Sequence, residues 1–139
     1  MKYFILTLSL TILTCINTIG YAQTQTQLTN LKKQHQSCLD KGVNMFSCSQ
    51  QYYKQMDSLL NVAYNRIRKP MSQTEKLAFK NEQIKWLQKR DAFFVKVDKE
   101  AAAESGPGPI GRDFLMIAMD EKANFVRKRV EELIKRTKS

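Results

Sequence analysis

The residues of this 139-residue chain that could take part in the most kinds of chemistry are its one histidine and two of its three cysteines, Cys38 and Cys48. His35 and Cys38 are separated by two residues, and Cys48 follows Cys38 in the next stretch of chain. Imidazole and thiolate are ligands that Zn²⁺ prefers, but a structural zinc site needs four of them, and no fourth ligand is apparent. The alternative is a Cys38–Cys48 disulfide, and the choice depends on the compartment in which the protein folds.

Residues 1–22 are typical of a secretory signal peptide. Lys2 gives a positive start, an apolar run extends from Tyr3 to Ile16, and Gly20 and Ala22 place small residues at the −3 and −1 positions of a cleavage site. The run is too short to favour a membrane span. We therefore predict an exported protein, periplasmic or extracellular, with no transmembrane span in the mature chain.

Cys15 offers a second possibility, because a lipoprotein signal cut before it would leave a lipid on its thiol. Thr14 and Ile16 on either side fit that pattern poorly. In either case export favours a disulfide between Cys38 and Cys48 over a metal site. The bond would close a loop of about ten residues and contribute on the order of 2–3 kcal/mol. We expect it to staple the first helix to the second, and we expect no metal and no cofactor.

The remaining residues are not spaced as catalytic groups usually are. The chain has no G-x-S-x-G, no H-E-x-x-H and no phosphate-binding loop. Asp91, Asp98 and Glu100 lie among lysines, as surface ion pairs commonly do. We predict a protein that is not an enzyme and has no catalytic residue.

The chain is strongly basic. Its formal net charge is +10, and loss of Lys2 with the signal peptide leaves 22 basic and 13 acidic residues, a net charge of +9. Such a charge favours anionic partners, although solubility and solvated helix faces are the simpler interpretation. Export and the lack of a recognised motif argue against nucleic acid. The roughly 115 residues that remain suffice for one domain.

The mature chain begins with a Thr- and Gln-rich stretch, residues 23–30, which we predict to be disordered. A short helix over residues 31–39 should end near Gly42, a residue favoured just past a helix end. Asn44 is then a plausible N-cap for a second helix that carries Cys48 and extends to Arg68.

Pro70 stops the second helix, because proline excludes the residue before it from helical geometry. Ser72 and Glu75 have the spacing of a capping box, which predicts a third helix from about Gln73 to Ala103. A turn this short forces the second and third helices into an antiparallel hairpin.

A Gly/Pro connector, residues 104–112, interrupts the helical pattern and precedes a fourth helix from about Asp113. No alternating strand pattern occurs, so the predicted fold is all-α: a small helical bundle in a single domain over residues 31–139. The apolar side of the fourth helix should consist of Leu115, Ala118, Val126, Val130, Leu133 and Ile134.

One face of the second helix and one face of the third mix polar with apolar residues. Counted from the turn, Asn61 is better matched to Gln83 than Asp57 is to Arg90, so Arg90 needs helix tilt or a partner from another helix. We interpret the faces as a polar network that fixes helix register and not as a ligand groove. Their members are Tyr53, Asp57, Leu60, Asn61, Tyr64 and Ile67, and Phe79, Gln83, Trp86, Arg90, Phe93 and Val97.

These residues carry a resemblance to a known family. A cysteine followed by tyrosine, then Asp-x-x-Leu-Asn-x-x-Tyr and Gln-x-x-Trp-x-x-x-Arg-Asp-Ala, resembles the LprI-type lysozyme inhibitors. The resemblance implies a small helical domain, secreted or lipid-anchored, that binds and inhibits c-type lysozyme. Cys38 falls where the family has its first cysteine. The matched positions are Cys48, Tyr53, Asp57, Leu60, Asn61, Tyr64, Gln83, Trp86, Arg90, Asp91 and Ala92, and more loosely Arg129, Glu132 and Leu133.

The chain departs from the family pattern in one paired way. The family usually has a third cysteine where this chain has Phe94 and a fourth after the Gly/Pro segment, where this chain has none. We therefore expect packing through Phe94, Phe114 and Phe125 to hold the last helix.

Three functions are compatible with these observations. The first is lysozyme inhibition, in which a basic protein would have to meet a usually basic enzyme. A local acidic patch would then have to contact the enzyme, and its candidates are Asp40, Asp57, Asp98, Glu100 and Glu104. The second is binding to an anionic envelope glycan or lipid. The third is self-association of the helical hairpin, which an apolar patch on the fourth helix would favour. The ligand-binding residues are not identified by the sequence.

Overall fold

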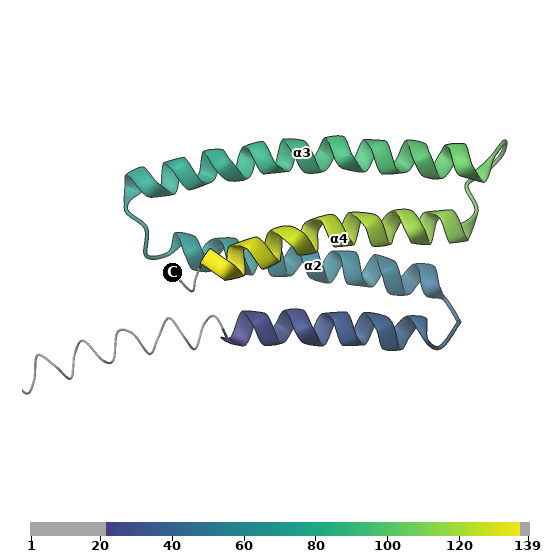
Figure 1. Ribbon diagram of the computed structural model, residues 1–139, viewed down its shortest axis with the longest axis horizontal. Coiled ribbons are helices and arrows are strands. Elements are labelled where there is room, and N and C mark those ends of the chain that lie inside the picture. The colour runs from purple at the N-terminus through teal and green to yellow at the C-terminus, as the bar shows by residue number, and fades with distance from the viewer. Residues whose placement is uncertain (1–21, 137–139) are drawn as a thin grey trace, which may run out of the picture.

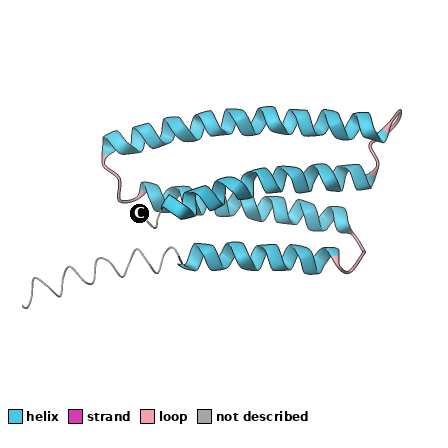
Figure 2. Cartoon of the chain, in the orientation of Figure 1, coloured by secondary structure: helices cyan, strands magenta, loops and turns pink. Residues whose placement is uncertain are grey.

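The computed structural model describes residues 22–136, which form four helices and no strand (Figures 1 and 2). The all-α prediction is therefore confirmed. An N-terminal helix occupies residues 22–39, followed by α2 (Met45–Arg68), α3 (Gln73–Ser105) and α4 (Arg112–Arg136). Successive helices run in opposite directions, so one end of the bundle carries the α2–α3 turn and the other carries the two remaining loops. Residues 1–21 of the predicted signal peptide, Cys15 among them, lie outside the described residues, whereas its last residue, Ala22, is the first described residue of the N-terminal helix.

The N-terminal helix corrects the prediction that residues 23–30 are disordered. They are helical, and Thr24 and Leu28 are each only 2% exposed. Leu28 packs into the main core, and the guanidinium of Arg66 donates hydrogen bonds to the Thr24 hydroxyl and, at 3.3 Å, to Gln23 Oε1. Burial of Thr24 and Leu28, four residues apart on one helix face, orders a segment that is otherwise polar. Gly42 ends this region as predicted, with a left-handed φ of 66°.

The start of α2 differs from the prediction in one detail. Asn44 does precede the first helical residue, Met45, but its side chain makes no capping hydrogen bond. Its backbone is left-handed, with φ 52°, a conformation that asparagine tolerates better than most residues. The Asn44 carbonyl accepts the first helical bonds, from Ser47 N at 2.8 Å and Cys48 N at 3.2 Å.

The start of α3 confirms the predicted capping box. Ser72 Oγ accepts from Glu75 N at 3.4 Å, and the Glu75 carboxylate accepts from Ser72 N at 2.8 Å. The hydrogen bonds from Ser72 hold the pKa of Glu75 below its usual value. Because only four residues separate α2 from α3, the two helices must pack as an antiparallel pair.

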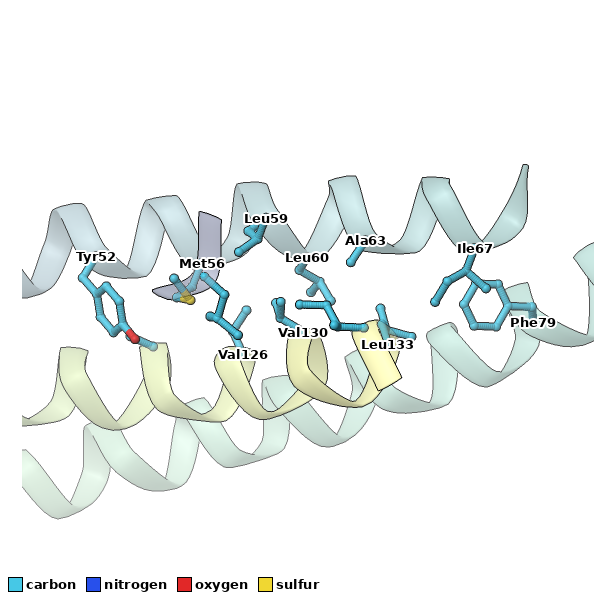
Figure 3. Packing of buried hydrophobic residues seen from close by; sticks show 13 residues of the cluster. Tyr52, Met56, Leu59, Leu60, Ala63, Ile67, Phe79, Val126, Val130 and Leu133 are labelled. Carbon is cyan, nitrogen blue, oxygen red and sulfur yellow. The ribbon is translucent and has the colours of Figure 1, made fainter. Parts of the chain in front are cut away.

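The main core lies chiefly between α2 and α4. Met56 and Leu60 of α2 meet Val126, Val130 and Leu133 of α4, and none of these side chains is more than 3% exposed (Figure 3). Burial of one such side chain contributes about 1.5–3 kcal/mol. The apolar stripe predicted for the second half of the fourth helix is therefore the side that it buries.

Aromatic rings bridge α2 and α3, whose backbones lie further apart than those of α2 and α4. Tyr64 stacks on Phe79 with ring centroids 4.8 Å apart, and Tyr53 meets the edge of Phe94 at 5.8 Å. Such aromatic pairs stabilise the fold by more than the burial of their apolar area alone. The hairpin is antiparallel as predicted, but α4 packs against both of its arms.

Aromatic packing also holds α4 against α3, largely as expected. Phe125 stacks on Phe93 at 4.6 Å and on Trp86 at 5.8 Å, and Phe114 packs into a second cluster around Val97. Phe94 meets Tyr53 of α2, and the Lys122 ammonium of α4 lies over its ring, 5.4 Å from the centroid. Within residues 22–136, no helix has the length and apolar content needed to cross a lipid bilayer.

Candidate functional site

Arg129 of α4 is the charged side chain that residues 22–136 bury most completely, at 4% exposed. Its Nε and Nη2 donate to Gln83 Oε1 at 3.2 and 3.0 Å, and Nη2 also donates to Glu82 Oε1 at 2.8 Å. Its Nη1 donates to Glu132 Oε2 at 3.1 Å, and the guanidinium carbon lies 5.8 Å from the Trp86 ring centroid. A buried guanidinium requires this density of partners, because an unpaired buried charge is strongly destabilising.

Glu82 extends this cluster to the end of α4. Its two carboxylate oxygens accept from Arg136 Nη1 at 2.9 Å and Nη2 at 2.8 Å, a bidentate pair. The hydrogen bonds from Arg136 hold the pKa of Glu82 below its usual value against the opposing effect of partial burial, and Arg129 acts in the same direction. The pKa of Arg136 is raised by the same contact. Glu82 thus bridges two arginines and ties the first half of α3 to the last turns of α4.

Arg90 forms a second, more exposed cluster that reaches α2. Its guanidinium lies over the rings of Trp86 and Phe94, at 5.9 and 5.7 Å, and donates to Asp91 Oδ1 from Nε at 2.9 Å and from Nη2 at 2.7 Å. Asp57 of α2 is 3.9 Å from Nη1, the outer limit of an ion pair. The predicted partner is therefore present, but the residue next in sequence is the closer one.

The two polar faces do not form the single network expected across the hairpin. Asn61 is exposed, and its Nδ2 donates at 3.1 Å to the carbonyl of Asp57 on its own helix. Gln83 turns to Arg129 instead, so the expected match between Asn61 and Gln83 is wrong. The Asn61–Gln83 pairing was predicted by counting residues along two helices only. The stronger donor to Gln83, the guanidinium of Arg129, lies on a third helix, α4. Leu60 lies in the core, and partial burial raises the pKa of Tyr53, with the Asp57 charge acting in the same direction.

The centre of the polar cluster was thus only partly anticipated. Arg129 and Glu132 entered the family motif loosely, and Glu82 and Arg136 were missed. A signal for Arg129 does exist, because it lies three residues after Val126 and four before Leu133, beside the apolar stripe of α4. A charge in that position needs partners from the helix that faces it.

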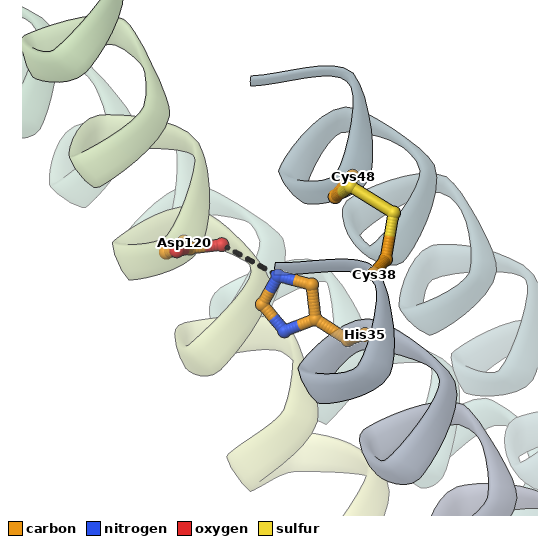
Figure 4. The surroundings of a disulfide bond; sticks show 4 residues. All are labelled: His35, Cys38, Cys48 and Asp120. Carbon is orange, nitrogen blue, oxygen red and sulfur yellow. Dashed lines mark ion pairs between the residues drawn. A yellow bond between two sulfur atoms is a disulfide. The ribbon is translucent and has the colours of Figure 1, made fainter. Parts of the chain in front are cut away.

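The histidine and the two cysteines contact different partners. Cys38 and Cys48 form the predicted disulfide, with Cα atoms 5.8 Å apart (Figure 4). His35 instead stacks on Tyr52 at 4.2 Å, and its Nε2 lies 3.2 Å from Asp120 Oδ1 of α4 without hydrogen-bonding alignment. In the described part of the chain, no three potential ligands are grouped to hold a metal ion. The disulfide accounts for both cysteines.

Charge is unevenly divided along the bundle. We call residues 36–48 and 95–122 the loop end, because they flank the loop before α2 and the Gly/Pro loop before α4. Elsewhere in residues 22–136 there are sixteen basic and six acidic side chains. The loop end has seven acidic side chains, Asp40, Asp98, Glu100, Glu104, Asp113, Asp120 and Glu121, against five basic ones, Lys41, Lys96, Lys99, Arg112 and Lys122.

The loop end therefore carries a formal charge of −2 on an otherwise basic molecule. Four of the five residues predicted to form an acidic patch lie there, and the fifth, Asp57, lies in the middle of α2. Two of the four are also paired, Asp98 with Lys122 at 2.5 Å and Glu100 with Lys96 at 3.5 Å. An apolar patch on the fourth helix, which would favour self-association, is not observed, since Ile117 is the one exposed large apolar side chain in α4.

The fold and its polar clusters define a small, disulfide-stapled helical protein whose motif residues mainly contact one another. The chain matches the family described as Lysozyme inhibitor LprI over residues 33–133, a range that includes parts of all four helices, and it belongs to that family. The predicted resemblance is confirmed. Neither the search of curated proteins nor that of solved structures gave a significant match.

Proposed function

We propose that this protein is an exported, non-enzymatic inhibitor of c-type lysozyme that meets the enzyme with its loop end. Membership of the lysozyme inhibitor family over residues 33–133 is the observation that carries the proposal. The signal-like residues 1–22 and the Cys38–Cys48 disulfide support export, because disulfides persist in oxidising compartments.

The charge distribution supports the loop end as the contact surface. A c-type lysozyme is usually basic, so most of this molecule would repel it. At the loop end the formal charge is −2, and approach from that side places the excess cations far from the enzyme. At physiological ionic strength, charges more than about 8 Å away are largely screened, so the near surface decides the interaction.

The shape of the loop end also suits an inhibitor. Residues 106–111 link α3 to α4 at the tip of the bundle, and Pro107 and Pro109 are exposed there (Figure 1). Gly106 and Gly108 have φ values of 75° and 120°, which side chains rarely allow, so the path of this loop depends on them. Gly111 N donates to Ser105 Oγ at 2.9 Å and closes the loop at its base. A narrow, restrained loop is suited to entering a concave enzyme cleft with little loss of entropy.

The test is lysis of bacterial cell walls by c-type lysozyme in the presence of the purified, oxidised protein at low and physiological salt. Glu104→Lys changes the loop-end charge by two units, and the new lysine suits the C-terminal end of α3. As a matched control, Asn81→Lys with Gln88→Lys adds the same charge at exposed positions of α3 outside the loop end.

We expect the wild type and the control to inhibit at both salt concentrations and Glu104→Lys to need several-fold more protein, most clearly at low salt. No inhibition by the wild type at large molar excess would refute the proposed activity. Equal loss in the two variants would refute the loop end as the contact surface.

A second candidate function is binding to an anionic envelope polymer or lipid. The excess of basic side chains outside the loop end favours it, and Arg68, Lys69, Lys76 and Lys135 near the α2–α3 turn form no ion pair within residues 22–136. Sedimentation with anionic vesicles and, separately, with cell-wall sacculi tests it. Binding should fall steeply with salt, and salt-independent or absent binding would exclude it.

A further inference from the structure

A groove of about 370 Å³ runs between the N-terminal helix and α2 on their solvent side. Each helix contributes four residues at the same spacing, positions 27, 30, 31 and 34 from one and 55, 58, 59 and 62 from the other. Positions i, i+3, i+4 and i+7 lie on one helix face, so two matching faces form the walls. The volume lies within the range of small-ligand sites.

The polar lining of the groove carries no charge, although 26% of the chain is charged. It consists of four carboxamides, Gln27, Asn30, Gln34 and Gln55, and the hydroxyl of Ser58. A carboxamide both donates and accepts, and so does a hydroxyl. Within residues 22–136 none of these side chains hydrogen-bonds to another group of the protein, so all five are available to a ligand.

Three aliphatic side chains complete the groove. Leu59 is buried beneath it, Leu31 is half-buried, and Val62 is 41% exposed at its edge. The exposed surface of the groove is more apolar than polar, so the groove offers apolar contact together with neutral hydrogen-bonding groups. A charged ligand would find no counter-ion there, and a purely apolar ligand would leave the carboxamides unpaired.

The two walls are fixed to each other beyond both ends of the groove. The Cys38–Cys48 disulfide joins them on one side, and the hydrogen bonds from Arg66 to Thr24 and Gln23 join them on the other. Leu28 packs into the core below. A groove held in this way loses little entropy when a ligand binds.

We propose that this groove binds a neutral oligosaccharide bearing N-acetyl groups. Sugar hydroxyls and the acetamido N–H and C=O match the neutral donors and acceptors of the lining, and the acetyl methyl group and ring C–H faces match Leu31, Leu59 and Val62. The proposal does not depend on lysozyme inhibition, because it uses different residues from the loop end.

Tri-N-acetylchitotriose, titrated into the full-length oxidised protein, tests the proposal through backbone amide NMR shifts and calorimetry. Gln55→Ala removes one wall group, and Ser58→Arg fills the groove with a long, charged side chain. Gln51→Ala is the matched control, because Gln51 is an exposed glutamine of α2 that does not line the groove. Circular dichroism establishes that each variant is folded.

We expect shifts confined to residues of the two walls, a roughly fivefold or greater loss of affinity in Gln55→Ala and no change in Gln51→Ala. Ser58→Arg should abolish binding, and a cellulose trisaccharide, which lacks N-acetyl groups, should bind more weakly. Absent wall shifts at millimolar saccharide would overturn the proposal, as would equal effects of the two glutamine variants. Equal binding of the cellulose trisaccharide would overturn the assignment of N-acetyl groups.

Discussion

Replacing Arg129 with alanine removes the most deeply buried of the side chains through which α4 makes polar contacts with α3. The guanidinium is 4% exposed and donates to Gln83, Glu82 and Glu132. The substitution leaves the Gln83 oxygen without its partner and opens a space beside Trp86. Since the family motif contains these positions, the variant tests whether the motif stabilises the bundle.

The expected loss of unfolding free energy in Arg129→Ala depends on how exposed each partner of Arg129 is. The side chains of Glu82 and Glu132 are 41% and 58% exposed, and Glu82 keeps Arg136, so each of these ion pairs contributes less than about 1 kcal/mol. Hydrogen bonds from a charged group to the buried side of Gln83 are worth about 1.5–3 kcal/mol. Contact with the Trp86 ring adds about 0.5–1 kcal/mol. The expected loss is about 3 kcal/mol, or a Tm lower by about 12 °C for a domain of this size.

Urea and thermal unfolding followed by circular dichroism measure this loss. Arg127→Ala is the matched control, because Arg127 lies on the same helix and pairs at 2.6 Å with Glu131, at a more exposed site. The control should cost about 0.5 kcal/mol. If Arg129→Ala costs no more than the control, the polar cluster does not stabilise the fold and the interpretation of the motif as structural is wrong.

Two further predictions concern the N-terminal helix and the acid stability of the cluster. Leu28→Ala should cost about 2–4 kcal/mol in urea unfolding, whereas the exposed Leu77→Ala should cost almost nothing, and equal effects would contradict the packing of residues 23–30. The pKa of Glu82 is lower in the folded state, so the unfolded state binds its proton first as the pH falls. The stability that Glu82 confers is therefore present above about pH 4.3 and lost as the pH falls through its folded pKa. In unfolding curves taken between pH 7 and pH 2.5, wild type and Glu82→Gln should differ at neutral pH and converge in acid, and a constant difference would contradict this linkage.

Features with a local cause could be predicted from the sequence. The capping box at Ser72 and Glu75 depends on residues three positions apart. Helix α2 ends at Arg68, close to Pro70 as predicted, but Lys69 keeps the helical backbone (φ −56°, ψ −49°) that the proline was expected to exclude. The helical end at Gly42 likewise needs only a residue that tolerates a left-handed backbone. Residues 23–30 were mispredicted because their order depends on a contact distant in sequence, the burial of Leu28 in the main core.

The polar cluster could be predicted only in part, for a similar reason. Counting residues from a turn relates two helices but says nothing about a third. Gln83 therefore seemed to face Asn61, whereas the buried guanidinium of Arg129 comes in from α4 and takes both hydrogen bonds. Arg129 lies 46 residues from Gln83 in the chain, so a pattern of neighbouring residues cannot predict their contact.

The two proposed binding surfaces differ in chemistry, and this difference makes them separable. At the loop end carboxylates outnumber cations, and its interaction with a basic enzyme depends on salt. The groove between the N-terminal helix and α2 is lined by neutral groups, so salt should scarcely affect its interaction with a saccharide. Glu104 lies on α3 and Gln55 on α2, and neither belongs to the other surface. Glu104→Lys should therefore weaken inhibition and leave saccharide binding unchanged, while Gln55→Ala should do the reverse. If each variant impaired both activities, the loop end and the groove would have to be parts of one continuous site.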